Sequence, residues 1–396
     1  MKARFTKIFD KIFYTPQPLP PCSISSVIEI DGQPNRSHLR IDHEGNSILV
    51  LNAATVLHLN QTATEIAYYL AKQMPNEAII AELNKRYNVS DEIAAQDIDD
   101  LKTRITALMQ TPDLDPETFL DMDRVGRHTS VLSAPLRMDC ALTYQTTSED
   151  SDNSSPVDRI DRYLETEDWK KIISAGWDWG IPHVIFTGGE PTLRPDLPEL
   201  IEHAENLGQV SGLITDGFRL AEKDYLALLL DAGLDHLMII LNEDIEQSWE
   251  SIRDSCNENI HLSVHFTIRS SNKLTITSVL DKLQNIGVKN LSLSSPDEEN
   301  VPYMLMASQR AIERGFNIVY ELPVPYSELN PVSLELKEDK NQLEGAARTW
   351  IYIEPDGDVL PAQGVLHSLG NLIRDSWMVT SAHRKEYLAK QAIHDE

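Results

Sequence analysis

The sequence predicts a mixed α/β protein whose second half repeats a strand–turn–helix unit. From Val131 to Leu322, short apolar runs alternate with helical segments at intervals of roughly 25 to 30 residues. Glycine follows most of the helical segments, and it is the residue that most readily closes a helix in the left-handed conformation. These observations predict parallel strands in an open sheet or a barrel, with any ligand bound where the strands end.

The elements of this region can be placed one by one. Strands are predicted at 136–142, 183–186, 211–214, 236–241, 262–268, 290–293 and 317–321. Helices are predicted at 156–175, 196–207, 221–232, 247–254, 274–286 and 302–314, closed by Gly176, Gly208, Gly233, Gly287 and Gly315. The candidate site is therefore built from the turns at 143–153, 187–191, 215–217, 241–243, 269–272 and 294–295.

One of these turns carries a distinctive pattern directly after the apolar run 184–186. Gly188 and Gly189 have no side chains, so the main chain there is predicted to lie open to a ligand. Glu190 supplies an acceptor, and Pro191 stops the strand. We interpret this turn as a ligand-binding turn.

Composition limits the classes of function. The chain has 396 residues, a net charge of −27 and three cysteines, Cys22, Cys140 and Cys256. The negative charge argues against nucleic acid or an anionic membrane as the main partner, because phosphate binding depends on clustered Lys and Arg. The cysteines are far apart, which argues against a disulfide framework. The start of the chain is a poor signal peptide, so we expect a cytoplasmic protein.

The first half of the chain has a different organisation. Residues 1–24 are predicted to form a short amphipathic helix, docked on the body or on a partner, and a linker that continues as a Pro- and Ser-rich connector to residue 27. Short β-type runs follow at 27–30, 38–42, 48–51 and 55–59, and they predict a small antiparallel sheet of three strands. Thr62 and Glu65 form a capping-box pattern, and further helices are expected at 76–87 and after Ser90.

A small sheet followed by three helices is winged-helix-like, and here the sequence resembles the PqqD family of peptide chaperones. The resemblance covers residues 25–110 and rests on Leu59-Asn60-Gln61-Thr62-Ala63, Ile80, Leu83, Tyr87, Val89, Asp97 and Leu101. It implies a domain that binds the leader segment of a ribosomal precursor peptide by adding it to a sheet edge. A plain winged-helix accessory domain is the alternative. Residues 111–130 are a predicted linker.

The second half resembles the radical SAM superfamily, and more narrowly its peptide-modifying members. The motifs ALTYQTT, FTGGEPTLRPDL, LITDGFRL and HFTIRSSN occur in order within residues 131–325. The resemblance implies a partial (β/α) TIM-like barrel that binds S-adenosylmethionine. The binding positions it implies are Gly188, Gly189, Glu190, Pro191, Thr215, Asp216, Asn242 and Glu243. Asp216 stands where the family usually has asparagine.

The departure from the family follows the first strand of the barrel. Members carry three cysteines there that hold a 4Fe–4S cluster, and this chain has Thr146, Asp150 and Asn153 at the aligned positions. A hydroxyl, a carboxylate and an amide are hard ligands and do not replace thiolates. The sequence therefore predicts no 4Fe–4S cluster. Oxygen groups at 149–153 could suit Mg²⁺ or Ca²⁺, but the segment also reads as an ordinary acidic loop.

The C-terminal part, residues 326–396, resembles the SPASM or twitch extension of the same enzymes. A hairpin is predicted around Pro355-Asp356-Gly357, and a Leu369-Gly370-Asn371 turn follows. Ala362 stands where a cluster cysteine is expected, and no cysteine follows Cys256. The expected auxiliary clusters are therefore absent as well.

The sequence as a whole predicts a radical-SAM-like protein without a cluster. It would bind a precursor peptide or a partner maturase in a peptide-modification pathway, with S-adenosylmethionine as a candidate ligand at Gly188 to Glu190. The alternative is an enzyme of the same ancestry that uses the barrel for cluster-independent chemistry. Neither nucleic acid nor a membrane is an expected partner. His265 lies on a predicted strand and is expected to be a hydrogen-bonded core histidine rather than a catalytic base.

Overall fold

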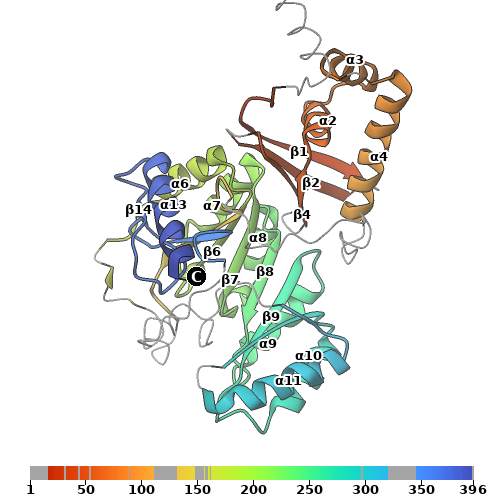
Figure 1. Ribbon diagram of the computed structural model, residues 1–396. Helices are drawn as coiled ribbons and strands as arrows, with labels where there is room; N and C mark the ends of the chain where they lie inside the picture. Colours follow the sequence, from red (N-terminus) through yellow and green to blue (C-terminus); the bar gives the residue numbers. More distant parts are fainter. Residues whose placement is uncertain are drawn as a thin grey trace, which may run out of the picture. The chain divides into compact units, whose positions relative to one another are not determined.

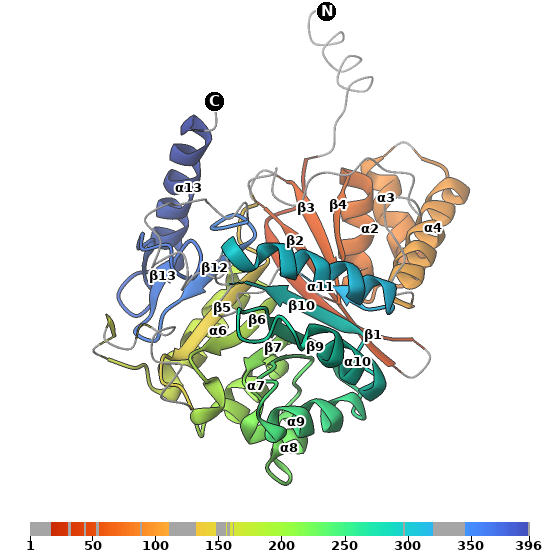
Figure 2. The ribbon, with the colours of Figure 1, turned by 90° about the horizontal axis from the view of Figure 1, so that it is seen from below.

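The computed structural model describes residues 17–110, 132–147, 156–319 and 345–394, apart from short gaps at 31–32, 43–44, 53–54, 88, 157–158, 161 and 296–297. The predicted N-terminal helix and the acidic segment after Thr147 lie outside these residues. The chain divides into two compact units, Met1–Arg124 and Val125–Glu396. Figures 1 and 2 show the elements of each unit from two directions.

The first unit contains an antiparallel sheet of four strands in the order β1-β2-β3-β4, one more than predicted. The strands are β1 (Cys22–Ile30), β2 (Gln33–Ile41), β3 (Ser47–Leu51) and β4 (Thr55–Leu59). The sequence predicted a connector up to residue 27, and this prediction was wrong from Cys22 onward, where β1 begins. Nine residues there pair with β2, because alternating Ser and Ile side chains suit a strand despite the serine content.

Three helices follow the sheet of the first unit, namely α2 (Gln61–Ala71), α3 (Asn76–Arg86) and α4 (Asp91–Gln110). Leu39 and Leu49 from the sheet form one core with Ala67 of α2 and Ile105 of α4. A second core between the helices contains Ile79 of α3. The two cores explain why the helices need the sheet and one another.

The predicted capping box at the start of α2 was wrong. Asn60 is the capping residue, and its side chain accepts a hydrogen bond from the Ala63 amide at 2.9 Å. Glu65 is instead buried and forms an ion pair with Arg86 of α3 at 2.7 Å. Tyr87 also donates a hydrogen bond to Glu65 at 2.7 Å. The prediction from the local pattern failed because the Glu65 carboxylate forms an ion pair with another helix instead of bonding to the start of its own helix.

The second unit is built on a ten-stranded sheet in which β5 to β11 run parallel and lie side by side in chain order. These strands are β5 (Arg137–Thr143), β6 (His183–Gly188), β7 (Val210–Thr215), β8 (His236–Ile240), β9 (His261–Thr267), β10 (Asn290–Ser294) and β11 (Asn317–Ile318). All seven predicted strands of the barrel are confirmed. In the described residues β11 does not pair with β5, so the sheet is open, which is the arrangement of a partial (β/α) barrel.

Helices connect successive strands of the barrel, as Figure 2 shows. They are α6 (Thr166–Trp179), α7 (Leu197–Leu207), α8 (Tyr225–Asp231), α9 (Glu246–Cys256), α10 (Ile276–Ile286) and α11 (Val301–Glu313). Val184 and Phe186 of β6 face the core that these helices share with the sheet. Ile185 faces the other way and meets Ile214 and Met238.

The predicted bounds of α6 needed the largest correction. The helix begins at Thr166 rather than at 156, and Gly180, with φ of 96°, closes it. Gly176 does not end the helix. It lies inside it, and an added Cβ would come within 2.8 Å of the Met138 sulfur of β5. Gly176 therefore serves close helix–strand packing.

The C-terminal part continues the same sheet beyond β5. Strand β12 (Trp350–Ile353) pairs in parallel with β5, and β13 (Asp358–Leu360) pairs back on β12. This is the predicted hairpin, turned at Gly357 with φ of 90°. Strand β14 (Gly370–Asn371) and the helix α13 (Trp377–His394) complete the unit.

None of the helices in the described part of the chain combines the length and the apolar character that crossing a bilayer requires.

Candidate functional site at the carboxyl ends of the strands

The turn after β6 packs against the chain that leaves β5. The Gly189 amide donates to the Thr143 carbonyl, and the Glu190 amide donates to the Gln145 carbonyl, both at 2.7 Å. A Cβ on Gly188 would lie 2.1 Å from the Thr143 oxygen, and one on Gly189 would lie 2.2 Å from the Gln145 oxygen. The glycines therefore make room for another backbone segment. That they also open the main chain to a ligand stays a prediction.

The Glu190 carboxylate lies at the centre of a network of hydrogen-bond donors. Its Oε1 accepts from the Thr192 amide at 2.9 Å, from the Thr192 hydroxyl at 2.6 Å and from the Thr215 hydroxyl at 2.8 Å. Its Oε2 accepts from the Asp216 amide at 2.7 Å. Glu190 is 2% exposed. The side chain therefore joins the turn after β6 to the turn after β7.

Asp216 lies beside Glu190 and extends the network to the segment after β5. The Thr147 hydroxyl donates to its Oδ2, and the Phe218 amide donates to its Oδ1 at 2.9 Å. Burial and the charge of Asp216 raise the pKa of Glu190 to about 8. Burial also raises the pKa of Asp216, against hydrogen bonds that include one with Glu190. The two carboxyl groups therefore compete for ionisation.

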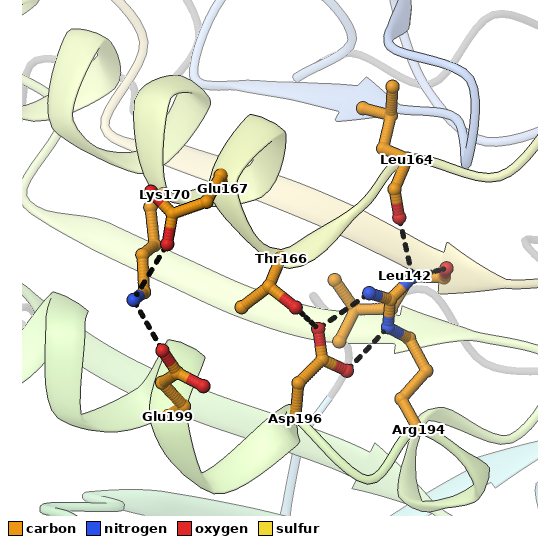
Figure 3. Close-up of polar contacts among 8 residues, drawn as sticks. All are labelled: Leu142, Leu164, Thr166, Glu167, Lys170, Arg194, Asp196 and Glu199. Atoms are coloured by element: carbon orange, nitrogen blue, oxygen red, sulfur yellow. Dashed lines mark hydrogen bonds and ion pairs between the residues drawn. The ribbon is translucent and has the colours of Figure 1, made fainter.

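Arg194 fixes both ends of the long connection between β5 and α6 (Figure 3). Its guanidinium donates to the Leu164 carbonyl at 2.9 Å and to the Leu142 carbonyl at 3.4 Å. Asp196 holds it through two contacts of 2.9 and 2.6 Å, and Thr166 donates to the same carboxylate at 2.7 Å. Such a two-point pair fixes the orientation of the guanidinium. Figure 3 also shows Lys170 between Glu167 and Glu199.

A second polar cluster joins the same connection to the C-terminal hairpin. Tyr144 donates to Glu354 at 2.9 Å, and Arg159 donates to the same oxygen. Arg159 also lies over the Tyr144 ring, 5.7 Å from its centroid. Burial raises the pKa of Glu354, and Arg159 opposes this. The sequence analysis did not identify Arg159 or Glu354, because the contact joins positions far apart in the chain.

Asn242 and Glu243 lie in a separate group at the end of β8. Asn272, which follows β9, donates to the Glu243 carboxylate at 2.7 Å. The Asn242 amide donates to Ser248 at 3.1 Å. Among the described residues, no hydrogen bond connects this group to Glu190, Thr215 or Asp216. The fold thus brings Gly188 to Pro191 together with Thr215 and Asp216, and it places Asn242 and Glu243 at the end of the next strand, β8.

The residues present do not fit a thiolate-bound cluster. Thr146 is partly buried in the segment after β5, while Asp150 and Asn153 lie outside the described residues. Cys140 is fully buried among core side chains of β5, where burial raises its pKa well above the usual value. Cys22 belongs to β1 and Cys256 to the last turn of α9. Ala362 is buried just beyond β13.

His265 has the environment expected of a core histidine. It is fully buried on β9, and its ring nitrogens lie 3.0 Å from the Ser292 hydroxyl and 2.8 Å from that of Ser294. Burial and the nearby Arg269 lower its pKa to about 3. The ring is therefore neutral at physiological pH and has both nitrogens engaged.

Comparison with known families finds a match within the parallel sheet. Residues 140–290 match the Radical SAM superfamily. The matched segment runs from within β5 to the start of β10 and includes the Gly188–Glu190 turn. The network around Glu190 thus lies within the segment that is similar to this superfamily.

Curated relatives of the chain are PqqA peptide cyclases. The Bradyrhizobium diazoefficiens protein is 44% identical over 88 residues, which are 22% of this chain and 23% of that protein. The Granulibacter bethesdensis protein is 24% identical over 266 residues, which are 59% of this chain and 68% of that protein. The most similar stretch thus spans under a quarter of its relative, and the broader match spans about two thirds.

Solved structures share the fold over most of the chain. Streptococcus suis SuiB bound to S-adenosylmethionine superposes with a TM-score of 0.57 at 14% identity, covering 90% of this chain and 87% of that one. SuiB bound to the precursor peptide SuiA gives a TM-score of 0.53 at 16% identity, covering 84% of each. At this identity the likeness concerns the fold alone.

Proposed function

We propose that this chain is a radical-SAM-like protein without an iron–sulfur cluster that binds a ribosomal precursor peptide, or the enzyme that modifies one. The observation that carries the proposal is the distribution of the cysteines. The sequence has three, and they belong to three separate elements, β1, β5 and α9. A 4Fe–4S cluster needs several thiolates around one point, and no such set exists in this chain.

The connection between β5 and α6 is also held by contacts that need no metal. Arg194 binds both of its ends, Thr147 contacts Asp216, and Arg159 binds Glu354. In this chain protein side chains supply the contacts that hold the described parts of the connection. This supports a barrel that keeps its shape and its binding role without iron.

Peptide binding is supported by the relatives and by the form of the first unit. The curated relatives are named as cyclases of the peptide PqqA, and one neighbour in fold is bound to the precursor peptide SuiA. The first unit has an antiparallel sheet with two edge strands, β1 and β4. Unpaired backbone groups at a sheet edge can accept a peptide as an added strand, which is the role we assign to this PqqD-like unit.

Binding of S-adenosylmethionine is a further part of the proposal. SuiB, which shares the fold, is named as bound to this molecule. Among the described residues no donor reaches the Gly189 carbonyl, and the acid pair Glu190 and Asp216 lies beside it. A carbonyl and a negative site suit the amino group of a methionine moiety.

Anaerobic reconstitution with iron and sulfide tests the absence of a cluster. A radical SAM protein ordinarily uses one, so the superfamily match alone would predict that the chain loads it. We expect no stoichiometric iron and no visible absorbance of a cluster. The matched control is the triple variant Thr146→Cys, Asp150→Cys, Asn153→Cys, which restores the thiols and shows whether the conditions can load this barrel. A stoichiometric cluster in the unmodified protein would overturn the central proposal.

Calorimetry tests the two binding roles separately. S-adenosylmethionine should bind the protein and bind more weakly to Glu190→Gln, which keeps the size of the side chain and removes its negative charge. A precursor peptide encoded beside the gene should bind the protein, and it should still bind Glu190→Gln, because the first unit is unchanged. Peptide binding without cofactor binding would remove only the cofactor part of the proposal.

A further inference from the structure

Three histidines form a row across the amino ends of the barrel strands. His183, His236 and His261 are the first residues of β6, β8 and β9. The ring centroids of His183 and His236 lie 5.6 Å apart, and those of His236 and His261 lie 5.0 Å apart. This histidine row lies at the opposite ends of the strands from the Gly188–Glu190 turn, so it is separate from the candidate ligand site.

A glycine of β7 allows the rings of His183 and His236 to meet across that strand. His236 pairs in register with Gly212. A Cβ on Gly212 would lie 3.7 Å from the Nε2 of His183 and 3.6 Å from the Cβ of His236. The His183 ring therefore reaches over Gly212. It does so on the face of the sheet that also carries Ile185, two residues along β6.

The His183 ring has a buried nitrogen without a hydrogen-bond partner. Among the described residues no group bonds to its Nε2, and that atom is shielded from solvent. Such a nitrogen is tolerated in a neutral ring, whereas a buried cation would cost far more. In the described part of the chain no group of three histidine, cysteine or acidic side chains could hold a metal ion. This leaves proton uptake as the chemistry that the histidine row can undergo.

The groups next to His183 disfavour a cation there. Arg137 is the first residue of β5 and pairs in register with His183. Its guanidinium lies 2.7 Å from the carboxylate of Asp139, so the positive charge remains near the ring but is itself partnered. Burial, His236 and Arg137 lower the pKa of His183 well below its ordinary value. The His183 ring is therefore neutral at physiological pH.

The groups at the other end of the histidine row supply no carboxylate to the His183 ring. The Asp235 carboxylate, in the turn before β8, accepts from the Ser211 amide at 2.9 Å. Beyond β9, Asn290 of β10 is uncharged, and Lys289 before it is exposed. Burial also lowers the pKa of His261.

We propose that the histidine row is a proton-sensitive contact, in which neutral rings hold the amino ends of β6 to β9 together and proton uptake by His183 opens them. A cation on His183 would repel the basic groups beside it, and it needs water that the closed row excludes. The strand ends part to admit that water. The contact requires neither a cluster nor a bound ligand, so its failure is separate from that of the proposed function.

Opening should become more frequent as the pH falls. The pKa of His183 is lowered while the ends are closed and returns to about 6.5 when they open, so opening takes up a proton. The stabilisation by the neutral ring is fully present above about 6.5 and is lost as the pH falls below it. Each pH unit in the acidic range should shift the opening equilibrium by up to about tenfold.

Hydrogen–deuterium exchange of the full-length protein tests the contact. Three backbone amides bond across the strand ends beside the histidine row, those of Val210, Asp235 and His261, at 2.9, 3.2 and 3.2 Å. Their protection, corrected for intrinsic exchange, should fall as the pH is lowered from about 7.5 to about 5. The Gly189 and Glu190 amides, which lie beyond the carboxyl end of β6, should lose much less protection and serve as the internal control.

His183→Gln isolates the titrating ring. Glutamine is polar but does not titrate in this range, so the variant should flatten the pH profile of the three amides. His265→Gln is the matched control, because it removes another buried histidine of the same sheet and should leave that profile unchanged. His183→Asn, which also does not titrate, replaces His183→Gln if that variant does not fold.

Three results would overturn the proposal. One is a flat profile for the three amides in the unmodified protein. Another is a profile in His183→Gln or His183→Asn that falls with pH as steeply as that of the unmodified protein. The third is an equal loss of protection at Gly189 and Glu190, which would mean that acid unfolds the whole unit rather than the amino ends of its strands.

Discussion

At the scale of single residues, Gly188 and Gly189 show how one motif can serve two purposes. The sequence suggests that the glycines admit a ligand, and the structure shows that they admit the backbone of the segment after β5. Gly188 also has φ of 127°, which favours glycine. A ligand can therefore reach only the part of this turn that the segment after β5 does not cover.

Gly189→Ala should lower the free energy of unfolding by more than about 2 kcal/mol, because its Cβ would meet the backbone oxygen of Gln145. Gly315→Ala is the matched control. Gly315 has φ of 84° and no atom within 4 Å of an added Cβ, so only the cost of the left-handed conformation remains, about 1 kcal/mol. Urea denaturation measures both. Equal losses would mean that the close approach at Gly189 does not constrain the fold.

At the scale of elements, strands β9 and β10 place a neutral histidine in the barrel. Ser292 and Ser294 come from β10, and Thr267 lies two residues further along β9 than His265. The alternation of a strand puts His265 and Thr267 on one face, and the parallel register brings both serines to the ring. His183 and His261 are also kept neutral by burial, which lowers the pKa of each.

The free energy of unfolding should fall as the pH is lowered below about 6.5. The pKa of His265 is lowered to about 3 in the folded protein, so unfolding takes up a proton in this range. The contribution of the neutral His265 ring to stability is fully present above the pKa that histidine has in the unfolded chain, and it is lost as the pH falls toward about 3. Between pH 7 and pH 5 we expect a loss of about 2 kcal/mol from this residue.

His265→Gln isolates that contribution. Glutamine can still form hydrogen bonds with the serines but does not titrate in this range. The loss in the free energy of unfolding between pH 7 and pH 5 should therefore be about 2 kcal/mol smaller in this variant. His183 and His261 remain in both proteins and cancel in the comparison. An unchanged slope in urea denaturation would show that His265 is not kept neutral by the fold.

At the scale of the whole molecule, two compact units follow one another in the chain. In each unit an arginine bonds to buried groups of other segments. In the first unit, Arg86 pairs with the buried Glu65. In the second, Arg384 is fully buried and donates to the carbonyls of Leu132 and Ala347 at 2.6 and 2.9 Å. Arg384 thereby joins α13 to the segments before β5 and β12.

The two units should respond separately to substitution. All six tryptophans lie in the second unit, so tryptophan fluorescence reports its unfolding, whereas far-ultraviolet circular dichroism reports both. Arg384→Leu leaves buried carbonyls without a donor, so it should lower the free energy of unfolding of the second unit by about 2 to 3 kcal/mol. The fluorescence transition should then move to a lower urea concentration.

Arg86→Met is the counterpart in the first unit. It leaves Glu65 buried without its cation, which costs about 3 kcal/mol or more. It should shift the circular dichroism signal of the first unit and leave the fluorescence transition in place. If each substitution shifted both signals equally, the two units would unfold as one.

The sequence by itself placed the strands of the barrel and indicated a resemblance to a family. Periodicity placed every strand of the barrel, and the Gly188–Pro191 motif marked the edge where the strands end, because both depend on neighbouring residues alone. The cysteine positions argued against a cluster for the same reason, since a missing thiol is visible without a fold.

Only the tertiary structure decided which groups meet. Glu65 pairs with Arg86 rather than capping its helix, Arg159 reaches Glu354, and Asp216 meets Glu190. Each contact joins segments that are separated in the chain, and its geometry depends on how helices and strands pack against one another. Local patterns carry no information about such pairs, so the polar network of the site could not be predicted from the sequence.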